Sequence, residues 1–181
     1  MKRGGKGGGN TITGLRYECK VDLAEFINAQ DGYEVKGENV LYEGNCVAHV
    51  YKKHAFYRFL KQKGVDWRKH ISRQLIPDNA IYVIVNNTMH ILEVKTQERP
   101  GSVDEKLQTC DFKKKQYQKL LYALNMDVRY IYILDDWFRQ PKYKDVLDYI
   151  ISVGCQYYFN YVPLYQLGLP MPHGQNDTTV L

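Results

Sequence analysis

Hydrophobic and polar residues follow two different periods along the chain, and together these periods predict both helices and strands. Apolar residues spaced three and four apart are typical of amphipathic helices, and they occur at residues 13–29, 54–64, 100–125 and 142–154. Shorter apolar or alternating runs are typical of strands, and they occur at residues 33–36, 39–42, 46–52, 128–134 and 156–164. The third helical segment is expected to be interrupted near residues 109–111. Helices mixed with a central sheet predict an α/β protein.

One further segment, "LIPDNAIYVIVNNTMHILEVKTQ" at residues 75–97, predicts a β-hairpin with an unusual set of charges. Asp78 precedes its first apolar run, and Glu93 and Lys95 stand near the end of its second. An unpaired charge is costly to bury, so three charges on one hairpin need an explanation. They form either a surface ion pair at the end of the hairpin or a chemical site.

A two-residue turn at Asn86 and Asn87 would bring the three charges to one face of the hairpin. In that register Asp78 lies opposite Lys95, and Asp78 and Glu93 are diagonal neighbours at roughly 7–8 Å. Glu93 and Lys95 share a face because side chains alternate along a strand. The sequence therefore predicts that two acids and one amine converge at one end of the hairpin.

Two carboxylates and an ammonium group in this arrangement suit the hydrolysis of a phosphodiester. Mg²⁺ prefers oxygen ligands, and it commonly takes one or two carboxylates while water and substrate phosphate fill its other positions. Such a metal makes bound water more acidic and stabilises the charge that develops on the phosphate. The lysine is suited to orient or deprotonate the attacking water. The residues thus indicate a Mg²⁺-dependent site for phosphodiester hydrolysis.

The motif of Pro77-Asp78 and Glu93-Val94-Lys95 resembles that of the PD-(D/E)XK nuclease superfamily. Further stretches resemble segments of its type II restriction endonucleases, namely "GGGNTITGLRYE", "PGSVDEKLQTCDFKKKQYQKL", "ILDDWF" and "YIISVGCQYYFNYVPLYQLGL". Together these stretches touch most of the chain. The resemblance implies a restriction-endonuclease-like core, in which a central mixed β-sheet is flanked by helices.

The resemblance also implies a role for individual residues. Asp78 and Glu93 would ligate the metal with the carbonyl oxygen of Val94, and Lys95 would be the catalytic lysine. Glu18 matches a first-helix glutamate that supports the metal site, and a solvent-facing position explains Glu18 equally well. The implied enzyme is a type II restriction endonuclease, which hydrolyses double-stranded DNA at specific sequences to leave 5′-phosphate and 3′-hydroxyl ends. A homodimer and a cognate DNA methyltransferase, as a genetic companion, are the implied partners.

The charge of the chain is compatible with a DNA substrate. The 181 residues carry a net charge of +5, with basic clusters in the N-terminal arm and at residues 61–73 and 112–119. Basic clusters bind the phosphates of nucleic acids, and they also occur on ordinary solvated surfaces. The residues expected to contact DNA are Arg73, Lys113, Lys114, Lys115 and Gln116.

Two other functions fit the same sequence. A structure-specific nuclease, of the Holliday-junction resolvase or repair-nickase type, would keep the three charged residues and act on branched DNA. A DNA-binding module with an inert site is the third hypothesis, and the presence of all three charges argues against it.

Composition and length predict how the chain is organised. Residues 1–10 are glycine-rich and basic, which predicts a flexible arm, and residues 11–181 are expected to form one nuclease domain. No apolar run approaches the ~20 residues of a membrane span, and the N-terminus lacks the apolar core of a secretory signal. We therefore expect a cytoplasmic protein.

Overall fold

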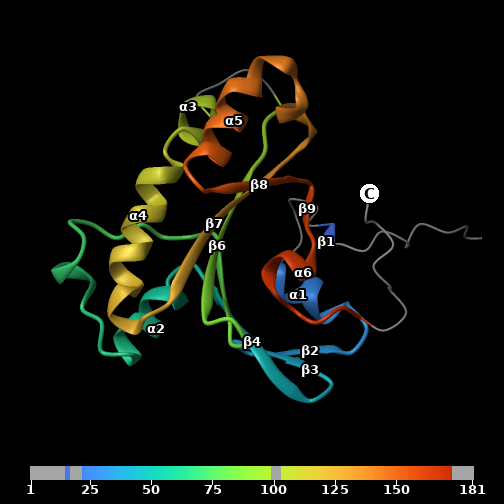
Figure 1. Cartoon of the computed structure of the whole chain (residues 1–181). Coiled ribbons are helices and arrows are strands. Elements are labelled where there is room, and N and C mark those ends of the chain that lie inside the picture. Colours follow the sequence, from blue (N-terminus) through green and yellow to red (C-terminus); the bar gives the residue numbers. More distant parts are fainter. Residues whose placement is uncertain (1–14, 17–21, 99–102, 173–181) are drawn as a thin grey trace, which may run out of the picture.

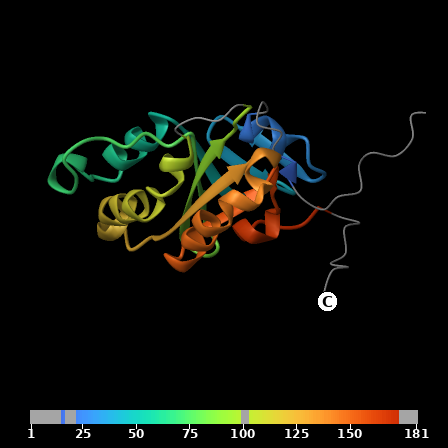
Figure 2. The same ribbon diagram turned by 90° about the horizontal axis from the view of Figure 1, so that it is seen from above.

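The computed structural model, which describes residues 15–16, 22–98 and 103–172, contains a seven-stranded sheet with helices on both faces (Figures 1 and 2). Its strands are β2 (Tyr33–Lys36), β3 (Asn39–Tyr42), β4 (Asn45–Lys52), β5 (Asn79–Val83), β6 (Thr88–Lys95), β7 (Asp127–Leu134) and β8 (Gln156–Phe159). They are ordered as they are numbered, antiparallel from β2 to β6 and parallel from β6 to β8. The predicted α/β class, with a mixed sheet flanked by helices, is confirmed.

Helices cover each face of the sheet, and each face has its own hydrophobic core. The helices are α1 (Leu23–Asn28), α2 (Ala55–Gln62), α3 (Val103–Leu107), α4 (Cys110–Leu121), α5 (Lys144–Ser152) and α6 (Leu164–Leu167). One core receives side chains from α2, α3, α4 and α5, and the other receives side chains from α1 and α6. Short 3₁₀ turns join these elements, namely η1 (Trp67–Lys69), η2 (Tyr122–Leu124), η3 (Asp136–Arg139) and η4 (Pro141–Tyr143).

No helix within the described residues has the length and the apolar character that crossing a membrane requires.

The alternation of β6 decides which face carries the predicted site. Met89 and Ile91 are fully buried in the core beneath α2 and α4, whereas Leu92 belongs to the core on the α1 and α6 side. Because side chains alternate along a strand, Glu93 and Lys95 continue the face of Met89 and Ile91. The charged end of β6 therefore lies on the side covered by α4.

The N-terminal helix is shorter than the sequence predicts. Helix α1 begins at Leu23, and the side chain of Asp22 caps it by accepting a hydrogen bond of 2.9 Å from the backbone N–H of Ala24. Leu15–Arg16 instead forms β1, which pairs antiparallel with β9 (Tyr161–Val162). The prediction of a helix from residue 13 is therefore wrong, because strand pairing with a distant segment overrides the local apolar spacing. The predicted arm at residues 1–10 lies outside the described residues.

Two other segments are interrupted. The helix predicted at residues 100–125 is divided near the expected position, since α3 ends at Leu107 and α4 begins at Cys110. The strand predicted at residues 156–164 is also divided, because Asn160 adopts a left-handed conformation with φ of 63°. Asparagine tolerates this conformation better than most residues, and it separates β8 from β9.

His90 lies in β6 and is 1% exposed. Burial, with a smaller contribution from the positive charge of Arg129, lowers the pKa of His90 to about 4. The unfolded chain binds a proton at its ordinary pKa of about 6.5, so the unfolded state gains protons first as the pH falls. The contribution of His90 to stability is therefore present above pH ~6.5 and is lost towards pH ~4.

Replacing this histidine should reduce the acid sensitivity of the fold. Between pH 7 and pH 5 we expect the free energy of unfolding of the native protein to fall by about 2 kcal/mol more than that of His90→Leu. Urea denaturation at the two pH values measures this difference. His54→Leu is the control, because His54 is exposed and should leave the native pH dependence unchanged. Parallel pH profiles for the native protein and His90→Leu would contradict the assignment.

Candidate functional site

The pairing of β5 with β6 positions the two predicted carboxylates. Asn79 pairs with Leu92 and Val83 pairs with Thr88, so residues 84–87 form a four-residue turn rather than the expected two-residue turn. The turn is closed by a hydrogen bond of 3.3 Å from the N–H of Asn87 to the carbonyl oxygen of Ile84. The predicted register is therefore wrong by two residues. A slip of two residues keeps every side chain on its expected face.

The corrected register moves the two acids closer along the strands. Asp78 directly precedes the Asn79–Leu92 pair, so it lies across from Glu93 rather than from Lys95. The carboxylate of Asp78 accepts a hydrogen bond of 3.1 Å from the backbone N–H of Val94. The side chain of Asp78 is thus hydrogen-bonded to Val94, the residue between Glu93 and Lys95.

Glu93 is the most enclosed charge of the group. Its carboxylate contacts the ammonium group of Lys95 at 2.6 Å and that of Lys113, on α4, at 2.7 and 2.9 Å. It also accepts a hydrogen bond from the hydroxyl of Tyr130 on β7. The side chains of Glu93, Lys95 and Lys113 are 15%, 17% and 24% exposed. An exposed surface ion pair does not describe this cluster, because three elements enclose it.

These contacts keep Glu93 ionised. Burial by itself raises the pKa of the Glu93 carboxyl, because it penalises the charged form. The positive charges of Lys95 and Lys113 and their hydrogen bonds outweigh burial, and the net result is a pKa below its ordinary value. Glu93 is therefore an anion at neutral pH and is available as a metal ligand.

The chain just before Asp78 is held by two tyrosines. The hydroxyl of Tyr57, on α2, accepts a hydrogen bond of 2.9 Å from the N–H of Leu75 and lies 3.0 Å from its carbonyl oxygen. The hydroxyl of Tyr117, on α4, donates to the same carbonyl oxygen at 3.0 Å. Leu75 is three residues before Asp78, so both helices restrain the approach of this acid to β6.

Tyr117 also shows that the two acids share one region. Burial, followed by the negative influence of Tyr57, Glu93 and Asp78, raises the pKa of the Tyr117 hydroxyl. Both carboxylates therefore lie close enough to act on this one buried hydroxyl. The hydrogen bond of Asp78 to Val94 and the ion pair of Glu93 with Lys95 place the three residues at the same end of the hairpin.

The basic residues predicted to contact DNA do not share one face of α4. Lys113 points to Glu93, whereas Lys114 donates a hydrogen bond of 2.7 Å to the carbonyl oxygen of Gly154. Lys115 pairs with Asp111 at 2.7 Å, and Gln116 is half-buried beside a shallow pocket. Successive helical residues project about 100° apart, which explains this divergence. Their contact with DNA stays a prediction.

Two other predicted residues lie apart from this cluster. Arg73 is exposed on the segment between η1 and β5, five residues before Asp78. Glu18 lies outside the described residues.

Three contacts of the site were not predicted from the sequence. Lys113 was expected on a DNA surface, yet it is the second cation on Glu93. Lys113 and Tyr117 are four residues apart, a spacing that places two side chains on the same face of a helix. Tyr57 and Tyr130 carried no such signal, because each stands within an apolar segment that predicts only a core residue.

The predicted ligands of the site are of the types that Mg²⁺ takes. Asp78, Glu93 and the backbone of Val94 would supply two carboxylates and one carbonyl oxygen, which are the ligand types that Mg²⁺ prefers. Within the described residues, no group of three or more His, Cys, Asp or Glu side chains is placed to hold a metal. Metal binding by these residues stays a prediction.

No protein-family model matches this chain, and no curated protein or solved structure is significantly similar to it.

Removing the helical lysine should strengthen metal binding. A divalent ion on Glu93 must displace Lys113 from both carboxylate oxygens, so Lys113→Met removes a competitor. We expect Lys113→Met to bind Mn²⁺, a spectroscopic substitute for Mg²⁺, about threefold or more tightly, which corresponds to ~0.7 kcal/mol. Titration followed by electron paramagnetic resonance measures the free ion.

Lys114→Met is the matched control, because Lys114 is the neighbouring lysine and contacts Gly154 instead of Glu93. Its affinity for Mn²⁺ should equal that of the native protein. Equal affinities for all three proteins would show that Lys113 does not compete with the metal.

Proposed function

We propose that this protein is a Mg²⁺-dependent endonuclease of the type II restriction class, acting on double-stranded DNA. One observation carries the proposal. The Asp78 carboxylate accepts a hydrogen bond from the backbone N–H of Val94, and Val94 separates Glu93 and Lys95, which form an ion pair. Asp78 directly precedes β5, and Glu93 and Lys95 lie in the adjacent β6, an arrangement that supports a PD-(D/E)XK site.

The fold supports the same proposal. The acids lie on an antiparallel hairpin, β5–β6, that is followed by α4 and by a parallel strand, β7. A mixed sheet of this kind, with helices on both faces, agrees with a restriction-endonuclease-like core. Cleavage of both strands of a palindromic site requires two active sites, so the proposal includes a C₂ homodimer.

The residues of the chain have distinct roles in the proposed reaction. Asp78, Glu93 and the Val94 carbonyl would hold Mg²⁺, whose chemistry is to acidify water and stabilise charge on phosphate oxygens. Lys95 would orient the attacking water through its ammonium group. The water oxygen forms a bond to phosphorus, and the bond from phosphorus to the 3′-oxygen breaks. The attacking water releases a proton to the surrounding solvent, and the 3′-oxygen takes a proton from a solvent water, so the products carry a 5′-phosphate and a 3′-hydroxyl.

Lys113 would act on the carboxylate rather than on the reacting atoms. In the structure it neutralises Glu93 together with Lys95. When Glu93 turns to a metal, the ammonium group of Lys113 remains beside the site and faces the incoming phosphate. A cation held in this way stabilises negative charge without reorganisation during the reaction.

Substitution of the three central residues tests the proposal. Asp78→Asn, Glu93→Gln and Lys95→Ala should each reduce Mg²⁺-dependent cleavage by about 10²-fold or more, because each removes a ligand or a charge at the phosphate. Cleavage is measured on supercoiled plasmid and on linear phage DNA. Asp145→Asn is the control, because Asp145 is an exposed acid on α5 and its loss should leave cleavage unchanged.

The products separate the two nuclease hypotheses. Discrete fragments from linear duplex, with one sequence at every cut end, support a restriction enzyme. Cleavage confined to four-way junctions would instead indicate a resolvase. Full activity in Asp78→Asn or Lys95→Ala would contradict the site itself.

A further inference from the structure

The positive charge of this protein is concentrated in one segment. Residues 53–73 contain seven lysines or arginines and a single acid, Asp66. This segment therefore carries a formal charge of +6, which exceeds the +5 of the whole chain. The formal charges of all other residues sum to −1, so this segment accounts for the net positive charge of the chain.

These cations are available to a partner. All seven are exposed, and they come from α2, η1 and the turns that flank them. Arg58 pairs with Glu38 at 3.2 Å, and Arg68 pairs with Asp66 at 3.7 Å. Within the described part of the chain, the other five form no ion pair, namely Lys53, Lys61, Lys63, Lys69 and Arg73.

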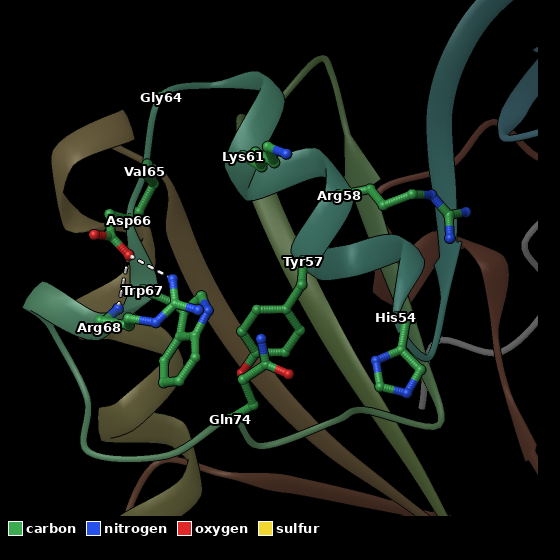
Figure 3. A pocket seen from close by; sticks show the side chains of 10 residues that line it. All are labelled: His54, Tyr57, Arg58, Lys61, Gly64, Val65, Asp66, Trp67, Arg68 and Gln74. Carbon is green, nitrogen blue, oxygen red and sulfur yellow. Dashed lines mark hydrogen bonds and ion pairs between the residues drawn. The ribbon is translucent and has the colours of Figure 1, made fainter.

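A pocket of about 570 Å³ opens in the middle of this segment. Figure 3 shows Tyr57, Trp67, Arg68 and Gln74 gathered on one side of it, with Lys61 on the helix above. The guanidinium group of Arg68 lies 4.9 Å from the centre of the Trp67 ring. The pocket thus combines an aromatic wall with cations, which bind the phosphates of nucleic acids.

The pocket and the carboxylates are joined by one short stretch of chain. Gln74 lines the pocket, Leu75 is bonded to Tyr57 and Tyr117, and Asp78 belongs to the site. Four residues span at most about 14 Å. Phosphates on one strand of a duplex follow one another at about 3.4 Å along the axis, so this reach corresponds to about four nucleotides.

We propose that the pocket between α2 and η1 is where this protein docks the backbone of duplex DNA. The inference rests on the proposed nuclease function and names the surface that function uses. Lys61 and Arg68 contact phosphates within about four nucleotides of the scissile one, and Trp67 provides the apolar wall. Lys113 and Lys114 of α4 are less suited to this role, because they are half-buried and bonded within the fold, to Glu93 and to the carbonyl oxygen of Gly154.

The salt dependence of DNA binding tests the inference. We compare the native protein with Lys61→Gln/Arg68→Gln, using the fluorescence anisotropy of a labelled 30-base-pair duplex in EDTA at several KCl concentrations. Each lost phosphate contact reduces the slope of log affinity against log salt by about 0.9. We therefore expect a slope shallower by about 1.8 and binding weaker by about tenfold or more.

The control is Lys36→Gln/Lys144→Gln. These lysines are 64% and 74% exposed, and each is paired with one acid, as Arg68 is. They lie on β2 and α5, and their loss removes the same number of charges. The slope and affinity of the control should match those of the native protein.

The fluorescence of Trp67 provides a second measurement. In a Trp137→Phe background Trp67 is the single tryptophan, because the chain contains two. Saturation with duplex DNA should quench its emission. An unchanged emission spectrum at saturation would overturn docking at this pocket.

The outcomes separate the inference from the proposed function. A native protein that shows no salt-dependent binding to duplex DNA would contradict the proposed function itself. Normal native binding with an unchanged slope in Lys61→Gln/Arg68→Gln would overturn the inference alone. If Lys61→Gln/Arg68→Gln loses binding to phosphatidylserine vesicles but binds DNA as the native protein does, the pocket is a membrane-binding surface. That result would also overturn the inference.

Discussion

The charge of Glu93 is the constraint on which the arrangement of this site depends. A carboxylate that is 15% exposed is unfavourable unless cations and hydrogen-bond donors surround it. Its partners come from three elements, with Lys95 from β6, Lys113 from α4 and Tyr130 from β7. The carboxylate is satisfied only when α4 and β7 pack correctly against β6. The same packing keeps Glu93 ionised, which is also what its proposed role as a metal ligand requires.

Much of the fold follows from local patterns in the sequence. The strands β2, β3, β4 and β7 match their predicted apolar runs because each run is short and bounded by turn residues. Helices α2, α4 and α5 match because their apolar spacing is sustained over two turns or more. The error at the N-terminus has a different origin. Leu15 has the spacing of a helix, but its partner is Val162, almost 150 residues away, and no local pattern reports such a pairing.

The charged residues of the candidate site were predictable from the sequence, whereas the residues that contact them were not. Asp78, Glu93 and Lys95 are recognisable because charge within an apolar hairpin is unusual, and an error of two residues in register preserves the face of each side chain. The contact of Lys113 with Glu93 is not predictable, because a run of three lysines does not show which of them faces the sheet until the orientation of the helix is known. The contacts of Tyr57 and Tyr117 with Leu75 depend on how two helices pack on the sheet. Sequence patterns do not specify that packing.

The segment at residues 74–78 connects the two parts of the proposed enzyme. One end lines the basic pocket through Gln74, and the other end carries Asp78, whose carboxylate is bonded to Val94. Between them, Tyr57 and Tyr117 hold Leu75 from α2 and α4. In the proposed complex, a phosphate backbone bound to α2 and η1 acts on the same restrained chain that positions Asp78, the proposed metal ligand. A rigid link of this kind favours alignment of substrate and catalytic groups, and alignment is the main requirement of phosphoryl transfer.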